Sequence, residues 1–259
     1  MGAKLTFLGT AGDPIVVGQQ HRASGGLILK VDDVQLHIDP GPGALVRAQQ
    51  LGINPRETTG VLVSHAHLGH SNDLNAVVSA MTHAGLDRRG VVLGHESALV
   101  DEVFHPYYKT CVERIIPMEI GKKAGIEHVD IMTLPMKHSS PGNGFKFLCP
   151  DFTLAYLSDT AFSKKLADNL LDCDVLVMNV VEPSGHENEH HLTTDTAIKM
   201  VTITKPAFAI ITHYGSKMIR ADPLYEARKI QQATGVQTLA ARDGTAIDPA
   251  NAAGMAVLL

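Results

Sequence analysis

The chain has no tryptophan, and aromatic residues make up only 5% of its 259 residues. Proteins that hold single-stranded nucleic acid usually stack the bases on aromatic side chains. Positive charge is not in excess either, since 22 Lys and Arg residues stand against 27 Asp and Glu residues, for a net charge of −5. Long nucleic acid is therefore not expected as a partner, and a small-molecule substrate is.

Cysteine and long apolar runs are also scarce. The three cysteines, Cys111, Cys149 and Cys173, stand singly without a C-x-x-C spacing, which is typical of reduced thiols in the cytosol. No apolar run approaches the roughly 18 residues of a membrane span, and the N-terminal residues do not form a signal pattern. We expect a cytoplasmic protein with no membrane partner. An apolar sheet edge leaves a homodimer open.

The arrangement of apolar residues predicts an α/β fold in one domain, residues 1–259. Hydrophobic residues make up 44% of the chain, and no Pro/Gly/Ser-rich linker divides it. Short apolar or alternating runs predict strands, and recurrences at i, i+3, i+4 predict helices. The expected strands are 4–9, 26–31, 34–39, 61–64, 91–94, most of 115–137, 145–149, 152–157, 175–181 and 208–212, with 238–247 closing the sheet. The expected helices are 44–51, 74–81, 96–104, a helix ending at 204, and 223–234.

Three histidines, His65, His67 and His70, lie within six residues directly after the apolar run 61–63. Neutral imidazoles are frequent metal ligands. Functional sites of α/β proteins gather at the carboxyl ends of strands, which is where this cluster lies. The cluster therefore predicts a metal site.

Further potential ligands follow other predicted strands. His138, Asp159 and His213 each come directly after an apolar run or in the loop attached to one. If these strand ends share one edge, the side chains converge. A carboxylate can then bridge two ions, and a water between ions about 3.5–4 Å apart loses a proton near neutral pH and becomes a nucleophile. Imidazole suits zinc, while manganese and iron remain open.

Taken together with Leu8-Gly9-Thr10, Asp39-Pro40-Gly41 and Arg242-Asp243-Gly244, these motifs resemble the metallo-β-lactamase fold superfamily over nearly the whole chain. The resemblance implies a four-layer αβ/βα sandwich with a cleft for two divalent metal ions along one edge of two facing sheets. It also implies the ligands: His65, His67 and His138 for the first metal, His70 and His213 for the second, and Asp159 as the bridge.

Within that superfamily the chain is most similar to the ribonuclease Z and phosphodiesterase branch, through residues 138–145, 156–160 and His191-Leu192-Thr193. In that branch the histidine of the His-x-Thr element lies at the scissile phosphate. The resemblance implies that His191 stabilises developing charge or protonates the departing oxygen, with His190 as an alternative. Thr193 or Thr194 is expected to cap the following helix.

The chain departs from the family in two places. The aspartate that usually precedes the third histidine is Gly69, so the affinity for a second metal is in question, with Asp73, Glu182, Glu187 or water as substitutes. Asp73 is better explained as stabilising the dipole of its helix. Only 20 residues separate His138 from Asp159, which leaves no room for the arm with which long-armed ribonucleases Z hold tRNA.

The expected function is hydrolysis of a small phosphodiester or cyclic phosphate, with His191 and Asp159 as the catalytic residues. Arg22 is expected to contact an anionic substrate or to form a structural salt bridge, and Asp39 to orient the first loops or a ligand histidine. Two alternatives stay open. One is hydrolysis of a carboxylic ester, lactone or thioester, and the other is a non-catalytic binding protein that has lost the second metal. The isolated histidines, such as His37, are expected in ordinary packing roles.

Overall fold

The computed structural model describes residues 2–254 and contains two facing sheets. The first sheet has seven strands in the order β15-β1-β2-β3-β4-β5-β6. Strands β3 to β6 run parallel to one another, whereas β15, β1, β2 and β3 pair antiparallel. Their bounds are β1 (Ala3–Phe7), β2 (Leu27–Val31), β3 (Val34–Ile38), β4 (Thr58–Val63), β5 (Val91–Gly94), β6 (Arg114–Pro117) and β15 (Ala246–Ile247).

The second sheet has eight strands in the order β14-β13-β11-β10-β9-β8-β7, and β12 pairs with β11 beyond this path. Strands β10, β11, β13 and β14 are parallel, so their carboxyl ends meet at one edge. The bounds are β7 (Lys123–Ile126), β8 (Val129–Pro135), β9 (Asn143–Leu148), β10 (Thr153–Leu157), β11 (Val175–Glu182), β12 (Leu192–Thr193), β13 (Phe208–Thr212) and β14 (Thr238–Ala240).

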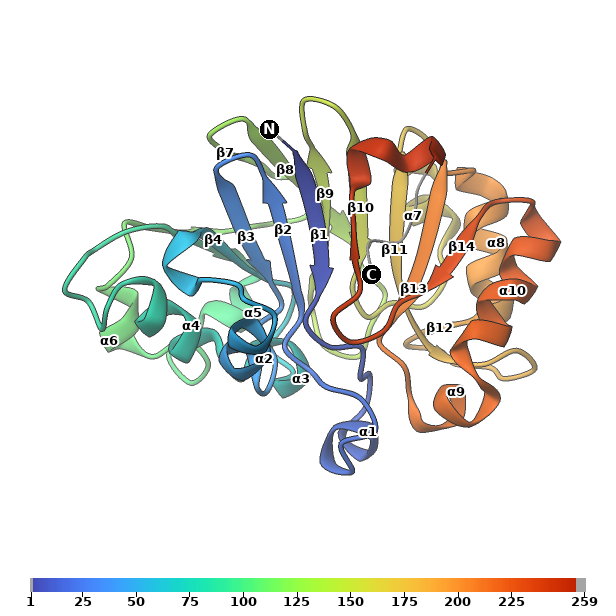
Figure 1. Cartoon of the computed structure of the whole chain (residues 1–259), viewed down its shortest axis with the longest axis horizontal. Helices are drawn as coiled ribbons and strands as arrows, with labels where there is room; N and C mark the ends of the chain where they lie inside the picture. The colour runs from blue at the N-terminus through green and yellow to red at the C-terminus, as the bar shows by residue number, and fades with distance from the viewer. Residues whose placement is uncertain (1, 255–259) are drawn as a thin grey trace.

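Helices cover the outer face of each sheet. In Figure 1 α2 and α4 lie on the left, against the first sheet, and α7, α8 and α10 lie on the right, against the second. The helices are α1 (Pro14–Gly18), α2 (Ala44–Gln50), α3 (Leu68–Ser71), α4 (Leu74–Met81), α5 (Glu96–Leu99), α6 (Pro106–Lys109), α7 (Lys164–Asp168), α8 (Thr194–Thr204), α9 (Ser216–Ala221) and α10 (Pro223–Thr234), with 3₁₀ helices at Pro55–Glu57 and Pro249–Gly254. None of the helices within residues 2–254 has the length and apolar character to cross a membrane.

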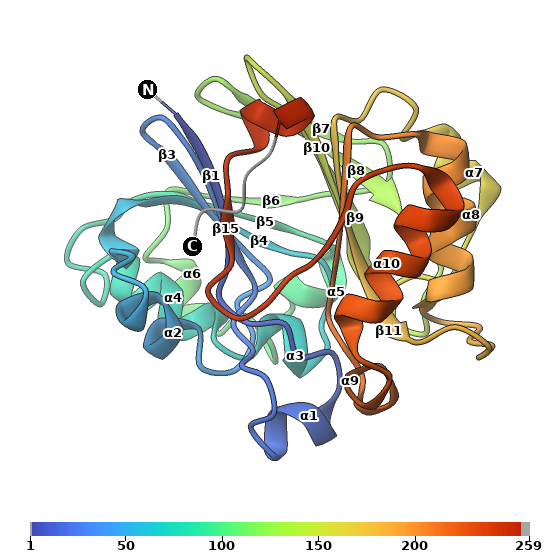
Figure 2. The same cartoon turned by 45° about the vertical axis from the view of Figure 1, so that its right-hand side comes forward.

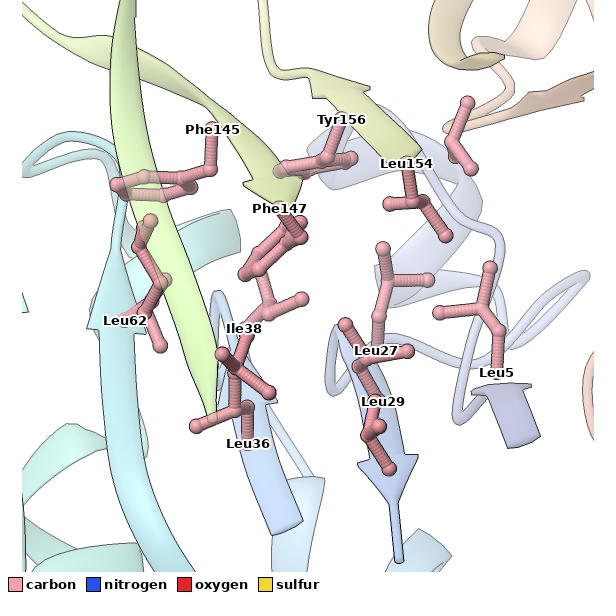
Figure 3. Packing of buried hydrophobic residues seen from close by; sticks show 14 of the residues in the cluster. Leu5, Leu27, Leu29, Leu36, Ile38, Leu62, Phe145, Phe147, Leu154 and Tyr156 are labelled. Carbon is pink, nitrogen blue, oxygen red and sulfur yellow. The ribbon is translucent and has the colours of Figure 1, made fainter. Parts of the chain in front are cut away.

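The main core lies between the two sheets and follows from the period of two along each strand. Leu36 and Leu62 of the first sheet face Phe145 and Phe147 of the second, and all four are fully buried (Figure 3). Each such side chain contributes about 1.5–3 kcal/mol by leaving water. The alternate residues of the same strands point outward to the helices.

Those outward residues build the two outer layers. Val61 and Val63 of β4 pack with Val77 of α4, while Met178 of β11 packs with Met200 of α8. Figure 2 shows the resulting order, which is helices, sheet, sheet, helices. The predicted four-layer αβ/βα sandwich is confirmed.

Local signals fix several helix ends as the sequence predicts. The Thr193 hydroxyl accepts from the backbone N–H of Thr196 and begins α8 in a capping box. Asp222 caps α10 by accepting from Leu224 N, with Pro223 at the first helical position. Gly235 ends α10 at a φ of 74°, a conformation that glycine adopts without a steric penalty.

Two predictions about the elements are wrong. Residues 238–247 do not close one sheet, because β14 is the edge of the second sheet and β15 pairs with β1 of the first. The turn between them carries the chain from one sheet to the other. The helix expected over 96–104 ends at Leu99, because Val100 is extended with φ −67° and ψ 158°. Short helices such as α1 cannot be predicted from the sequence pattern, since they span too few residues to show the helical period of apolar residues.

Candidate metal centre

The carboxyl ends of strands from both sheets meet at one edge of the sandwich, the lower edge in Figure 1. The loops that follow β4, β8, β10 and β13 bring six predicted ligands together there. Their donor atoms form two groups, each within 4.8 Å, and Asp159 is common to both: His65, His67, His138 and Asp159 in one, and His70, Asp159 and His213 in the other.

In the first group three imidazole nitrogens face one point. Nδ1 of His67 lies 3.1 Å from Nε2 of His65 and 3.2 Å from Nε2 of His138. Nε2 of His65 is 3.9 Å from Oδ2 of Asp159. Three imidazoles and a carboxylate at this spacing match the tetrahedral donor set that zinc prefers.

The second group uses both oxygens of Asp159. Nε2 of His70 lies 3.3 Å from Oδ2, and Nε2 of His213 lies 3.1 Å from Oδ1. The carboxylate is 5% exposed and lies between the two sets of imidazoles. Its position suits a bridge between two ions.

A buried carboxylate orients two of the ligands. Asp39 accepts hydrogen bonds from Ser64 N at 2.7 Å, Ser64 Oγ at 2.8 Å and Tyr156 OH at 2.8 Å, and its Oδ2 lies 2.8 Å from Nδ1 of His70. Ser64 Oγ in turn lies 2.9 Å from Nδ1 of His65. Both rings therefore bond through Nδ1 and present Nε2 to the site, as metal-binding histidines usually do. Asp39 thus orients a candidate ligand histidine, His70, as expected from the sequence.

Three residues that support the centre were not predicted from the sequence. Asn179 donates to Asp159 Oδ1 at 2.9 Å, Tyr156 reaches Asp39 from the second sheet, and Ser64 joins Asp39 to His65. Of these three residues, only Asn179 stands out in the sequence, because it is a polar residue within the apolar run 175–181. A buried amide in such a run needs a partner, and here the partner is the carboxylate of Asp159.

Close backbone approaches hold the loops in place. His213 has a φ of 62°, which is uncommon for a residue with a side chain. A Cβ on Gly12 would lie 2.0 Å from the carbonyl oxygen of His213, and one on Gly41 would lie 2.0 Å from that of Gly69. Glycine at both positions lets the loops lie against the histidine segments.

The electrostatics favour the metal-binding form of each donor in the first group, but not of His70 in the second. Burial lowers the pKa of His67 and His138 and takes that of His65 far below its usual range, so these rings are neutral. Burial would raise the pKa of Asp159, but His213 and His70 hold it well below its usual range. Burial likewise opposes the charge of His70, yet Asp159 and Asp39 outweigh it and raise its pKa to about 10. His70 would therefore have to lose a proton to hold a metal, and the donors as a whole fit divalent ions.

Comparison with known proteins agrees with this geometry. Residues 35–214 match the model of the β-lactamase superfamily domain. An uncharacterised protein of Methanocaldococcus jannaschii is 30% identical, with 97% of each chain covered. The chain belongs to the metallo-β-lactamase fold family of hydrolases.

Two further members of this family are similar over most of their length. A ribonuclease Z of Pyrobaculum neutrophilum is 26% identical over 83% of this chain and 87% of its own. The crystal structure of the metallo-β-lactamase fold protein YhfI from Bacillus subtilis matches with a TM-score of 0.82 and 17% identity, covering 95% of this chain and 99% of that one. The predicted superfamily and its ribonuclease Z branch are confirmed.

The departure from the family at Gly69 has no substitute among the described residues. Glu182 and Glu187 lie outside both donor groups. Asp73 occupies the N-cap position of α4 and its Oδ2 accepts from Ala44 N at 2.9 Å. The expectation that Asp73 stabilises the dipole of α4 is therefore incomplete, because its carboxylate also hydrogen-bonds the first residue of α2.

His190 and His191 reach the centre from the loop between β11 and β12. Nε2 of His191 lies 3.6 Å from Oδ2 of Asp159, and its ring centre is 4.9 Å from that of His138. His190 is exposed and contributes its backbone, whose carbonyl oxygen lies 3.0 Å from Nδ1 of His138. The ring of His190 is farther away, 6.4 Å from that of His138. The structure thus brings His191, rather than His190, to the carboxylate of Asp159.

Arg22 lies in the loop after α1, half-buried and outside both donor groups. No carboxylate of residues 2–254 lies within 4.0 Å of its guanidinium, so the alternative of a structural salt bridge is wrong. Arg22 precedes Ala23, whose carbonyl oxygen accepts from Ala11 N at 2.9 Å, and Ala11 pairs with Tyr214, the residue after His213. The backbone of Arg22 therefore lies on the segment next to the His213 loop.

Proposed function

We propose that this hydrolase is a phosphodiesterase that acts on a small phosphodiester or cyclic phosphate. The observation that carries the proposal is the position of His191, an imidazole outside both donor groups whose Nε2 lies 3.6 Å from the bridging Asp159. Such a ring can supply a proton beside the metal centre without giving up a ligand.

The proposal includes two divalent ions, with zinc as the metal that best matches the donors. His65, His67 and His138 would hold the first, His70 and His213 the second, and Asp159 would bridge them. When bound, a pair of ions lowers the pKa of a water between them and polarises a phosphoryl oxygen.

The chain's own residues then have separate tasks in the reaction. As water adds to phosphorus and gives up one proton to the solvent, the bond from phosphorus to the leaving oxygen breaks. Nε2 of His191, protonated from the solvent, donates its proton to that oxygen. Arg22 is proposed to contact a non-bridging phosphoryl oxygen as a fixed positive charge. Proton donation of this kind contributes about 10²–10⁴ in rate.

The small size of the substrate is proposed from the short segment that joins His138 to Asp159. Strands β9 and β10, with a turn of 149–152, take up most of the chain between His138 and Asp159. No arm projects there to hold a long RNA. The ribonuclease Z relative supports phosphorus as the target atom, while the small size of the substrate follows from this chain alone.

The activity test compares substrate classes on zinc-loaded protein. The panel is bis(p-nitrophenyl) phosphate, 2′,3′-cyclic nucleotides, a lactone and a thioester. We expect diester hydrolysis that His191→Ala lowers by about 10²–10⁴ on the cyclic nucleotides. Hydrolysis at carbon without diester hydrolysis would overturn the proposal, and so would turnover that does not depend on zinc. No turnover of any substrate, with less than one zinc per chain, would favour a binding protein.

The cytoplasm is the proposed compartment. All three cysteines are unpaired, and Cys111 and Cys173 are buried. Unpaired buried thiols are characteristic of a reducing environment.

A further inference from the structure

The loop of residues 183–191, between β11 and β12, is fixed at its start by two helices. Ser184 N donates to Glu226 of α10 at 2.8 Å, and Gly185 N donates to Asp195 of α8 at 2.7 Å. Glu226 is 1% exposed and is held in turn by Lys229 at 2.6 Å. This loop is therefore anchored on the outer helical layer although its other end reaches the metal centre.

At that other end one side chain organises the turn. Oδ1 of Asn188 accepts from the backbone N–H of His190 at 2.9 Å and of His191 at 3.0 Å, and it lies 3.3 Å from Nδ1 of the His191 ring. Because two backbone N–H groups point at this atom of Asn188, it is the amide oxygen and not the amide nitrogen. The third contact sets the ring of His191 with Nδ1 toward Asn188 and Nε2 toward Asp159.

The same turn also reaches a metal ligand. The carbonyl oxygen of His190 lies 3.0 Å from Nδ1 of His138, so it accepts the N–H of the neutral ring and leaves Nε2 free for metal. The N–H of His190 is one of the two bonded to Asn188. A shift of the turn would move the carbonyl of His190 and the ring of His191 together.

We propose that Asn188 is a positioning residue with two effects: it aims Nε2 of His191 at the leaving oxygen, and it holds the carbonyl that orients His138. The first effect rests on the proposed phosphodiesterase function, and the second does not. Asn188 itself touches neither the substrate nor the donor atoms of the metal groups.

The first effect predicts a dependence on the leaving group. An alkoxide, as released when a cyclic nucleotide opens, needs a proton as the bond breaks. The p-nitrophenolate ion is a stable anion that leaves without one. Loss of alignment at His191 therefore slows the first reaction more than the second, whereas a general loss of structure slows both equally.

The kinetic experiment uses Asn188→Ala with two matched variants. Asn188→Asp keeps an acceptor oxygen at the same place, and Glu189→Ala changes an exposed neighbour that makes no hydrogen bond within the described residues. We expect Asn188→Ala to lower kcat on 2′,3′-cyclic AMP about 10- to 100-fold and on bis(p-nitrophenyl) phosphate less than about 5-fold, with KM nearly unchanged. Asn188→Asp should retain most of the activity. Equal losses on both substrates, or no loss, would overturn the first effect.

The second effect is tested without turnover, by competition for zinc between the protein and a coloured chelator. Asn188→Ala should weaken the tightest zinc site about 3- to 10-fold, and Glu189→Ala should not. Unchanged zinc affinity in Asn188→Ala would overturn the role toward His138. If the wild-type protein hydrolyses no diester at all, the proposed function fails, and the zinc competition still decides this part of the inference.

Discussion

The carboxylate of Asp39 lies 2.8 Å from Nδ1 of His70, with both side chains buried. The same oxygen accepts the hydroxyl of Tyr156 from the second sheet. Asp39 follows β3 of the first sheet, so one carboxylate joins the two sheets directly behind the metal centre. The position of His70 thus depends on how the sheets pack.

Replacing Asp39 tests that dependence. Asp39→Asn keeps the size of the side chain but removes the charge that holds the N–H of His70, and it should weaken zinc binding at the second donor group about 10- to 100-fold. Tyr156→Phe removes one hydrogen bond to Asp39 but leaves the contact between Asp39 and His70. It should therefore weaken zinc binding less than Asp39→Asn does. Isothermal titration with zinc measures both, and equal affinities in wild type and Asp39→Asn would contradict the role.

Gly41 should tolerate no side chain. A Cβ there would lie 2.0 Å from the carbonyl oxygen of Gly69, within the segment that carries the three histidines. We expect Gly41→Ala to destabilise the fold by about 1–3 kcal/mol and to weaken zinc binding. Gly69→Ala is the matched control, because its Cβ would meet nothing within 4 Å and its stability should stay within about 0.5 kcal/mol. Urea unfolding of the metal-free proteins measures the free energy of unfolding of both variants. Equal values for Gly41→Ala and the wild type would contradict the steric effect.

His37 should make the protein sensitive to mild acid. Burial lowers the pKa of His37 from 6.5 to about 4, although its ring donates to the carbonyl of Gly25 at 2.9 Å. Between these two pH values the unfolded chain binds a proton that the folded chain does not, so stability falls as the pH drops through this window. From pH 7.5 to pH 5.0 this group should cost about 2 kcal/mol.

The matched variant for that prediction is His37→Gln, whose amide can donate to the same carbonyl but does not titrate. Urea unfolding of both proteins at pH 7.5 and 5.0 isolates the contribution of this histidine, because the other groups titrate alike in the two. An identical loss of stability in both proteins would contradict it.

The parts of the fold that local pattern determines were predictable from the sequence. Apolar runs such as 61–63 mark the buried strands, and the rule that sites lie at the carboxyl ends of parallel strands indicated that the six side chains converge if their strand ends share one edge. Their assignment as metal ligands came from the resemblance to the family. The course of 238–247 was not predictable, because two short strands joined by a turn look the same whether they enter one sheet or two.

The supporting residues depend on contacts distant in sequence. Glu226 binds the loop at Ser184 from 42 residues away, and Tyr156 bonds Asp39 across 117 residues. Nothing local to these residues sets them apart from other buried or surface polar groups. Asn188 acts locally, three residues before His191, but its turn is recognisable only once the loop is seen at the metal centre.

We propose that this chain holds two ions and holds the second less tightly, because no side chain at Gly69 adds to His70, His213 and Asp159. Zinc titration of the metal-free protein by calorimetry, with the metal counted by mass spectrometry, tests it most directly. We predict one tight zinc per chain and a second that is at least about 10-fold weaker, tightened by Gly69→Asp and unaffected by Gly69→Ala. Two zinc ions of equal affinity in the wild-type protein, or less than one tight zinc per chain, would contradict the account.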